Sequence, residues 1–341
     1  MNISGGAADT KREQHQPLTS TLCMSVALCT FNGARYLEEQ LASILGQGRP
    51  PDEMVVCDDG SVDRTIDLLK DFAKSAGFPV QILVNPTRLG FTKNFEKAIR
   101  LCRGDIVVLS DQDDCWYQTR LAVLEHAFIN NPAQGLIFSD ADIVDQDSRQ
   151  VGKRYWETCG LNEKRRNQIK NGRALDVLLK HNVVCGAMAA FRSSLCAIVL
   201  PIPEITVHDM WIAVIASIVS EIGILPEPTI KYRKHSLQQM GILNYSFKEA
   251  IAKSKQIGPE DYRNLASQYA MMRDRILQHT AGSQFDEKIR KLERKIGFMQ
   301  SRGCLPSERW RRLPTILRDT FSLDYFRYAE GYKSIAKDLT R

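Results

Sequence analysis

The chain has no hydrophobic run long enough to cross a bilayer. Its longest apolar stretch, residues 210–220, is about half of the roughly 20 residues that a transmembrane helix needs, and Glu221 follows it directly. The first twenty residues are polar and have no apolar core. We therefore expect a disordered leader over residues 1–22 rather than a signal peptide, and a protein that works in the cytoplasm.

Paired cysteine motifs are also absent. Nine cysteines are scattered along 341 residues, an odd number without a Cys-x-x-Cys pair. Several lie inside predicted strands, which indicates reduced, buried thiols in a cytosolic protein. Four signatures of other enzyme classes are missing as well: Gly-x-Gly-x-x-Gly, Gly-x-x-x-x-Gly-Lys-Ser/Thr, His-Glu-x-x-His and Gly-x-Ser-x-Gly.

Apolar runs and helical spacings alternate from residue 24, which predicts an α/β fold. Short buried strands are expected at residues 24–30, 54–57, 80–84 and 106–109, with helices between them. This order predicts a mostly parallel central sheet flanked by helices. Residues 152–172, rich in Lys, Arg and Asn, are expected to form an exposed, mobile loop.

Strand signals disappear beyond about residue 245. Four helical segments follow, so we predict an α/β domain over residues 23–244 and a helical extension over residues 245–341. The extension is basic, because residues 251–341 contain 19 Lys+Arg against 11 Asp+Glu. Solvated helix faces are the commonest meaning of such an excess, and attraction to anionic lipid is the alternative. We expect no nucleic-acid partner.

The buried strand at residues 106–109 runs into three carboxylates, Asp111, Asp113 and Asp114. Ligands of open α/β sheets lie beyond the carboxyl ends of the strands, so this is a place for a binding site. Asp111 and Asp113 are two residues apart, which puts both on one side of extended backbone. A divalent cation is held by such oxygens together with substrate phosphates. The segment predicts a metal and diphosphate site, although a solvated turn is an equally common meaning.

Four motifs in order resemble the family 2 glycosyltransferases of the glycosyltransferase A fold, over roughly residues 24–240. They are Cys29-Thr30-Phe31-Asn32-Gly33, Asp58-Asp59-Gly60-Ser61 with Asp63 and Thr65, Asp111-Gln112-Asp113-Asp114, and His208-Asp209. The later run Tyr232-Arg233-x-His235-Ser236 is similar to the rhamnosyltransferase-like branch. Phe31 stands where many relatives have Tyr, and His208 stands where Glu is usual.

The resemblance implies how the donor would be bound. Thr30, Phe31 and Asn32 would line the nucleotide pocket. Asp59 would accept a hydrogen bond from the imide of a uracil or thymine ring, since a pyrimidine N3–H is a donor and a carboxylate only accepts. Asp111 would face the ribose.

The resemblance also implies the catalytic groups. Asp113, with His235, would hold Mg²⁺ or Mn²⁺. Asp209 would take the proton from the acceptor hydroxyl, and a helix N-terminus there would stabilise its ionised form. The alternative for Asp209 is an ordinary helix N-cap. Candidate acceptor or phosphate contacts are His208, Arg233 and Arg88.

The implied activity is an inverting, metal-dependent transfer of one sugar. The donor would be a nucleotide-diphosphate sugar (dTDP- or UDP-linked, with rhamnose as a candidate), and the acceptor a saccharide or a lipid-linked saccharide in surface polysaccharide assembly. Peripheral contact with the inner face of the plasma membrane is expected from the basic extension and from Trp310-Arg311-Arg312-Leu313.

Two other classes of function stay open at this point. A nucleotidyltransferase would share the sheet and the acidic pair, but it would normally show a Gly-rich, basic loop after the first strand, which Thr30-Phe31-Asn32-Gly33-Ala34 does not supply. A non-catalytic scaffold that binds sugar nucleotides would use the basic helices to dock a partner. Metal-dependent release of nucleotide diphosphate separates an enzyme from such a scaffold.

Overall fold

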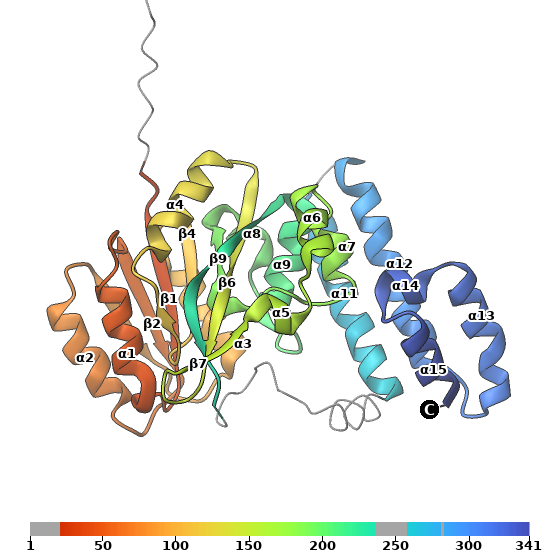
Figure 1. The fold of residues 1–341 in the computed structure, drawn as a ribbon, viewed down its shortest axis with the longest axis horizontal. Helices are drawn as coiled ribbons and strands as arrows, with labels where there is room; N and C mark the ends of the chain where they lie inside the picture. The colour runs from red at the N-terminus through yellow and green to blue at the C-terminus, as the bar shows by residue number, and fades with distance from the viewer. Residues whose placement is uncertain (1–20, 236–257, 281–282, 341) are drawn as a thin grey trace, which may run out of the picture.

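The computed structural model describes residues 21–235, 258–280 and 283–340, and its centre is a single mixed sheet (Figure 1). In these residues the sheet has nine strands in the order β3-β2-β1-β4-β8-β6-β9-β5, with β7 paired to β6. The strands are β1 (Met24–Thr30), β2 (Glu53–Asp58), β3 (Val80–Val84), β4 (Ile106–Ser110), β5 (Cys115–Trp116), β6 (Gln134–Val144), β7 (Gln150–Arg154), β8 (Ala189–Arg192) and β9 (Glu221–Arg233).

The first half of the sheet is parallel, as the sequence predicts. β1 pairs in parallel with β2 and β4, and β2 pairs in parallel with β3. The second half is mixed: β6 and β9 are parallel to each other, whereas β8 runs antiparallel to β4 and β6. β6 and β9 are each longer than their apolar runs suggest, because they pair with each other along most of their length. The expected α/β class with a mostly parallel sheet is confirmed.

Helices cover both faces of the sheet, and the side chains of β1 alternate between them. Val26 and Leu28 share a core with residues of α1, α2 and α4, whereas Ala27 and Cys29 share a core with residues of α3 and α9. The helices of this region are α1 (Ala34–Leu45), α2 (Thr65–Ser75), α3 (Phe91–Leu101), α4 (Arg120–Asn130), α5 (Tyr155–Cys159), α6 (Glu163–Lys170), α7 (Ala174–Leu178), α8 (Cys196–Val199) and α9 (His208–Val219).

Residues 152–172 are structured, so the expectation of an exposed, mobile loop was wrong. The segment contains the end of β7, then α5 and α6. Trp156 is buried, and its ring Nε1–H donates to the carbonyl of Ser139 at 3.1 Å. Leu161 and Ile169 are buried as well. The few apolar residues of this polar stretch anchor it against the core, which overrides its average composition.

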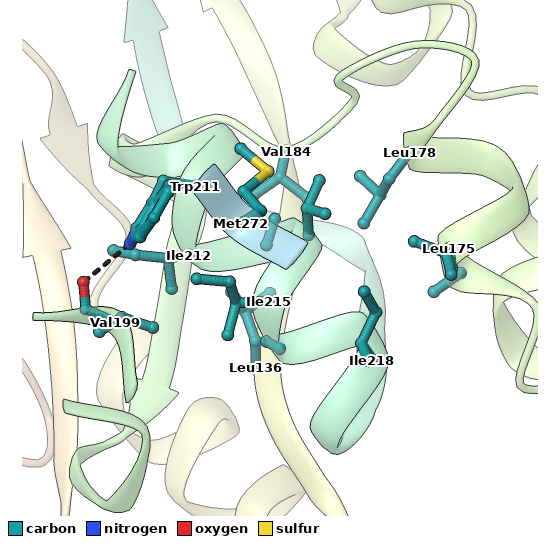
Figure 2. Packing of buried hydrophobic residues seen from close by; sticks show 14 of the residues in the cluster. Leu136, Leu175, Leu178, Val184, Val199, Trp211, Ile212, Ile215, Ile218 and Met272 are labelled. Atoms are coloured by element: carbon teal, nitrogen blue, oxygen red, sulfur yellow. Dashed lines mark hydrogen bonds between the residues drawn. The ribbon is translucent and has the colours of Figure 1, made fainter. Parts of the chain in front are cut away.

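The C-terminal helices join the core of the α/β region. They are α11 (Pro259–His279), α12 (Asp286–Gly303), α13 (Leu313–Phe321), α14 (Asp324–Tyr328) and α15 (Tyr332–Thr340). Figure 2 shows Met272 of α11 in the same cluster as Trp211, Ile212 and Ile215 of α9, where Trp211 Nε1 donates to the Val199 carbonyl at 2.7 Å. The predicted helical extension is therefore packed on the sheet-covering helices.

Two expected boundaries fall outside the described residues. The leader predicted over residues 1–22 lies there for its first 20 residues, and so does the domain boundary predicted at residues 244 and 245. Both stay predictions. All nine cysteines lie in described residues and none forms a disulfide. Only Cys29 and Cys57 are buried, Cys23 and Cys304 are exposed, and the other five are half-buried. No helix within the described ranges has the length and apolarity that crossing a membrane requires.

Candidate active site

The carboxyl ends of β2, β1 and β4 lie side by side, and the first three sequence motifs begin there. Thr30 pairs with Asp58 in the register of β1 and β2, and Leu28 pairs with Ser110 in that of β1 and β4. The Cys29 thiol lies between the motifs: burial raises its pKa well above the usual value, and Cys57, Asp111 and Asp59 raise it further. Asp59 and Asp111 therefore lie around one point at the end of the sheet.

The ends of β1 and β2 form one hydrogen-bonded unit. The Thr30 hydroxyl donates to Asp58 Oδ2 at 2.7 Å, and the Ser61 hydroxyl donates to the same atom at 2.6 Å. Asn32 has a φ of 48°, in the left-handed region that Asn tolerates, and its backbone N–H donates to Ser61 Oγ at 2.8 Å. Thr30 is buried. In this structure its hydroxyl and Asn32 hold the turn that carries the predicted nucleotide pocket.

Phe31 is clamped through its backbone by Gln112, a residue of the acidic motif. The Phe31 N–H donates to Gln112 Oε1 at 2.8 Å, and Gln112 Nε2 donates to the Phe31 carbonyl at 3.1 Å. A Cβ on Gly33 would overlap the end of the Gln112 side chain, so any larger residue there would displace Gln112 from this position. The Arg88 guanidinium lies over the Phe31 ring, 3.8 Å from its centroid, and so covers the expected base platform. A contact of Arg88 with phosphate or acceptor stays a prediction.

Asp59 is buried and accepts several hydrogen bonds. Its Oδ1 accepts from the Leu89 N–H at 2.6 Å and from Asn85 Nδ2 at 3.0 Å, and its Oδ2 accepts from the Gly90 N–H at 2.9 Å. Arg88 Nε lies 3.8 Å from Oδ2. The carboxylate thus holds the loop after β3 against β2. Because a carboxylate has about four lone-pair directions, a pyrimidine imide would have to use the remaining one.

The acidic motif after β4 places two carboxylates near a histidine. His235 Nε2 lies 2.7 Å from Asp113 Oδ2. Burial raises the pKa of Asp111 to about 7, and the carboxylates of Asp113 and Asp209 add to the shift. Asp114 is fully buried, and its Oδ1 accepts from the backbone N–H of Arg233 at 3.0 Å. The motif therefore presents Asp111 and Asp113 to the site and uses Asp114 to fix the end of β9.

Arg233 is buried, unlike the ligand contact that we expected. Its Nε donates to the Asp113 carbonyl at 2.8 Å, its Nη1 to Ser148 Oγ at 2.7 Å, and its Nη2 to Glu39 Oε2 at 2.6 Å. The side chain is 1% exposed. These contacts make Arg233 a support for the Asp113 loop, and a direct contact with phosphate or acceptor stays a prediction.

Asp209 lies in the first turn of α9, and it is not the N-cap. Val207 occupies the N-cap position, which excludes the capping interpretation. Asp209 Oδ1 accepts from Asn182 Nδ2 at 3.1 Å, and Oδ2 accepts from the Gly186 N–H at 3.3 Å. Burial raises its pKa to about 6, and these hydrogen bonds oppose the shift. The carboxyl is therefore fixed in orientation and easier to protonate than an exposed aspartate.

His208 packs against two aromatic side chains of α3. Its ring stacks on Phe95 of α3 with 4.1 Å between the ring centroids, and Phe91 lies edge-on at 6.2 Å. Burial lowers its pKa to about 3, so the imidazole is neutral at neutral pH. Contact with Phe95 gives His208 a packing position between α9 and α3, and a direct contact with the acceptor stays a prediction.

The donor set fits a divalent cation that shares its ligands with a substrate. Asp111 and Asp113 are close enough to repel each other, and a cation between them would relieve that repulsion. Oxygen ligands suit Mg²⁺ or Mn²⁺, and the His235 nitrogen beside Asp113 suits Mn²⁺ better. In the part of the chain that the structure describes, no three His, Cys, Asp or Glu side chains are arranged to hold an ion. Phosphate oxygens would complete the shell.

Some residues of this site were missed by sequence reasoning. Gln112 stands inside the acidic motif, so its position between Asp111 and Asp113 could have revealed it. Asn182 and Asn85 carry no such signal, because each reaches its carboxylate from a segment without a motif.

Comparison with known proteins finds glycosyltransferases among the relatives of this chain. The sequence profile described as Glycosyl transferase family 2 matches residues 25–197. An uncharacterized glycosyltransferase of Haemophilus influenzae is 24% identical over 263 residues, covering 71% of this chain and 74% of that protein. The dTDP-rhamnosyl transferase RfbG of Shigella flexneri is 26% identical over 243 residues, covering 68% of this chain and 78% of its own.

Solved structures show the same fold at low identity. The structure of TarS 1–349 from S. aureus in complex with UDP-GlcNAc aligns with a TM-score of 0.55 and 16% identity. The alignment covers 93% of this chain and 88% of the TarS chain. The mannosyltransferase PcManGT from Pyrobaculum calidifontis, in complex with GDP-Man and Mn²⁺, aligns with a TM-score of 0.52 and 16% identity over 94% of this chain and 84% of its own. With a family profile that covers half of its length, the chain belongs to glycosyl transferase family 2.

Proposed function

We propose that this glycosyltransferase moves one sugar, with inversion, from a nucleotide-diphosphate donor to a saccharide or lipid-linked acceptor, and that Asp209 is the general base. The observation that carries the proposal is the convergence of carboxylates from distant segments. Asp113 from the end of β4 and Asp209 from α9 both raise the pKa of Asp111. Burial is the main cause of the raised pKa of the Cys29 thiol, and both Asp111 and Asp59, which follows β2, raise it further.

The reaction is a single displacement at the anomeric carbon. The acceptor oxygen forms a bond to that carbon while the bond from the carbon to the donor phosphate breaks, and the electron pair of the broken bond leaves with the nucleotide diphosphate. The acceptor proton passes to the Asp209 carboxylate. Asn182 and Gly186 hold that carboxylate, so its free lone pairs are aimed before the acceptor arrives.

Asp113 and His235 are the candidate ligands of Mg²⁺ or Mn²⁺, with Asp111 beside them. When bound, such an ion neutralises the negative charge that develops on the leaving diphosphate. Asp111 would also face the ribose, and Phe31 with Asp59 would take the base. The dTDP-rhamnosyl transferase relative supports a dTDP-sugar and rhamnose as first candidates, and the UDP-GlcNAc complex of TarS supports a UDP-sugar as the alternative.

The decisive experiment measures nucleotide diphosphate release from sugar nucleotides with Mg²⁺ or Mn²⁺ and a saccharide acceptor. Asp209→Asn should lower the rate by about 10²–10⁴-fold, because it removes general-base help, while donor binding by calorimetry is retained. Donor binding without turnover in the unaltered protein would contradict the proposal and favour a scaffold. Transfer of a nucleotidyl group in place of a sugar would favour a nucleotidyltransferase.

We also propose that the helical extension touches the membrane through one face of α13. Four apolar side chains at spacings of three and four residues are exposed on α13 and on the short helical turn before it: Trp310 in that turn, and Leu313, Leu317 and Phe321 in α13. Trp310 is 69% and Phe321 82% exposed. Arg311 and Arg318, with side chains 57% and 67% exposed, flank the row. An apolar row with arginine on its border fits an anionic bilayer surface, where a lipid-linked acceptor of surface polysaccharide assembly would be found.

A further inference from the structure

A large basic cavity lies between the α/β region and the C-terminal helices. It has a volume of about 800 Å³, and residues from α6, α7, α12 and α14 line it. Eight lysine and arginine side chains line the cavity against two carboxylates. We propose that this cavity binds a phosphate or diphosphate group of the acceptor substrate, an inference that rests on the proposed function above.

Only some of the cavity's positive charges are neutralised by ion pairs. Asp176 accepts from Arg173 Nε at 2.9 Å and lies 3.1 Å from Lys291 Nζ. Lys291 also pairs with Glu287 at 3.1 Å. Arg294 Nη2 lies 3.2 Å from Asp324 Oδ1, outside the cavity lining. Three of the eight cations, Arg173, Lys291 and Arg294, are thus ion-paired.

Other cations of the cavity are held by neutral carbonyl groups. Arg165 Nη1 donates to the Gly160 carbonyl at 2.6 Å, and Lys180 Nζ donates to the Phe326 carbonyl at 2.9 Å. A carbonyl orients these side chains without cancelling their charge. Lys164 from α6 and Arg290 from α12 are exposed at the wall and extend the positive surface across both sides.

The charge pattern selects phosphate over a singly charged group. One carboxylate would leave most of this charge uncompensated, whereas a phosphate or diphosphate carries several acceptor oxygens and more than one negative charge. Arginine presents a planar set of donors that matches phosphate oxygens, and α6, α12 and α14 each supply at least one arginine to the lining. The volume lies within the range of about 300–1,000 Å³ found for small-molecule sites.

The cavity wall continues into the segment that holds Asp209. Lys180 lines the cavity, and Asn182, two residues further on, donates to Asp209 Oδ1 at 3.1 Å. Two residues span at most about 7 Å. Between them, His181 Nε2 lies 2.7 Å from Glu330 Oε1, before α15. An acceptor whose phosphate is held at Lys180 and Arg165 would therefore need to extend only a short way to reach Asp209, the proposed base.

Inorganic pyrophosphate, added to the full chain without divalent cations, tests the site directly. The double variant Lys164→Glu/Arg290→Glu should bind pyrophosphate at least about tenfold more weakly by calorimetry, since two attractive charges become repulsive. The control Lys70→Glu/Arg103→Glu makes the same change of net charge on α2 and before β4, and it should bind as the unaltered protein does. Equal binding by all three proteins would overturn the proposal, and so would equal weakening in both double variants.

Acceptor kinetics connect the cavity to transfer. With an acceptor that carries phosphate, the cavity variant should show an acceptor KM raised about tenfold, with the donor KM unchanged. With the phosphate-free form of the same saccharide, the variant and the unaltered protein should have equal KM values. A water-soluble phosphosaccharide and an isoprenoid diphosphate saccharide separate the two sources of phosphate. A raised KM of the cavity variant for both acceptors supports a phosphate site. A raised KM for the isoprenoid acceptor alone would overturn it.

The experiments also distinguish failure of the proposed transferase function from failure of the cavity proposal. A protein that binds pyrophosphate through the cavity but releases no nucleotide diphosphate from any donor would contradict the transferase mechanism while the pyrophosphate comparison still decides the cavity.

Discussion

At the scale of single residues, the ionisation of Asp209 is expected to set the acid limb of activity. Burial raises its pKa to about 6, and only the carboxylate can accept the acceptor proton. We expect kcat/KM to rise with pH up to about 6 and to level off above it. Nucleotide diphosphate release measured between about pH 5 and pH 8 checks this, and a limb that persists unchanged in Asp209→Asn would assign it to another group.

Ionised Asp209 should also lower the free energy of unfolding at neutral pH. Its folded pKa of about 6 lies above the ordinary value of 3.8, so the folded state keeps a proton that the unfolded state has released between these pH values. The free energy of unfolding therefore falls as pH rises through this interval. Asp209→Asn should remove the fall and raise the free energy of unfolding above pH 6 by up to about 3 kcal/mol.

Urea unfolding of both proteins at about pH 4 and about pH 7 measures that difference. His208, whose pKa is lowered by burial, acts in the opposite direction as pH falls, but it is present in both proteins and cancels in the difference. A gain of the same size at both pH values would contradict the assignment to Asp209.

Gly33 is the second residue with a specific expectation. A Cβ there would overlap Gln112, which clamps Phe31 through two hydrogen bonds. Gly33→Ala should weaken donor binding about tenfold, the size of one lost charge-free hydrogen bond or slightly more. Gly77→Ala is the control, because a Cβ there meets no atom within 4 Å. Calorimetry with UDP and dTDP measures both, and equal affinities for the two variants would contradict the role of the clamp.

At the scale of elements, α13 decides the membrane contact. Leu317 and Leu277 are each 52% exposed, one on the apolar row of α13 and the other on α11. Leu317→Glu should lower binding to phosphatidylglycerol vesicles about tenfold, because it removes an apolar contact and adds a negative charge that the anionic lipid repels. The control Leu277→Glu should leave binding unchanged. Co-sedimentation with phosphatidylglycerol and with phosphatidylcholine vesicles measures this. Equal partition of the unaltered protein to both lipids would remove the proposal.

The elements also show why composition misled at residues 152–172. Polar and charged residues dominate that stretch, yet Trp156, Leu161 and Ile169 are buried and suffice to dock α5 and α6. Three apolar anchors in about twenty residues are too sparse for a periodic signal, so only the packing reveals them.

At the scale of the whole molecule, the C-terminal helices and the α/β region should unfold together. Met272 of α11 is fully buried in the core that contains Trp211 and Ile215 of α9, whereas Met271 is 41% exposed. Met272→Ala should lower the free energy of unfolding by about 2–5 kcal/mol, and Met271→Ala by less than about 0.5 kcal/mol. Thermal unfolding followed by circular dichroism and by donor binding should give one midpoint in each protein. Two separate transitions would contradict the shared core.

A buried ion pair between Arg302 and Asp338 joins the C-terminal helices to one another. Arg302 donates to Asp338 through Nε at 2.6 Å and Nη2 at 3.0 Å, and the Tyr325 hydroxyl donates to the same carboxylate at 2.8 Å. α12, α14 and α15 therefore meet at one polar point inside an apolar core, where loss of either charge leaves the other uncompensated.

The sequence by itself determined the strands of the first half of the sheet and the chemical type of the site. Alternating apolar residues and strand-end carboxylates are local patterns, and parallel strands bring their carboxyl ends to one edge whatever the rest of the chain does. The positions of Asp59, Asp111 and Asp113 at strand ends could be predicted for this reason, whereas Asp209, in the first turn of α9, was expected only from the family resemblance. Gln112 lay within reach of the same reasoning.

Only the tertiary structure decided which side chains face the site and which support it. Arg233, a candidate ligand contact by its motif, is buried against Asp113, Ser148 and Glu39, and His208 turns to Phe95. Asn182 donates to Asp209 from a segment without a motif. Cations from α6 and α12, more than a hundred residues apart in the chain, line one cavity. These contacts depend on packing between distant segments, and no local spacing records them.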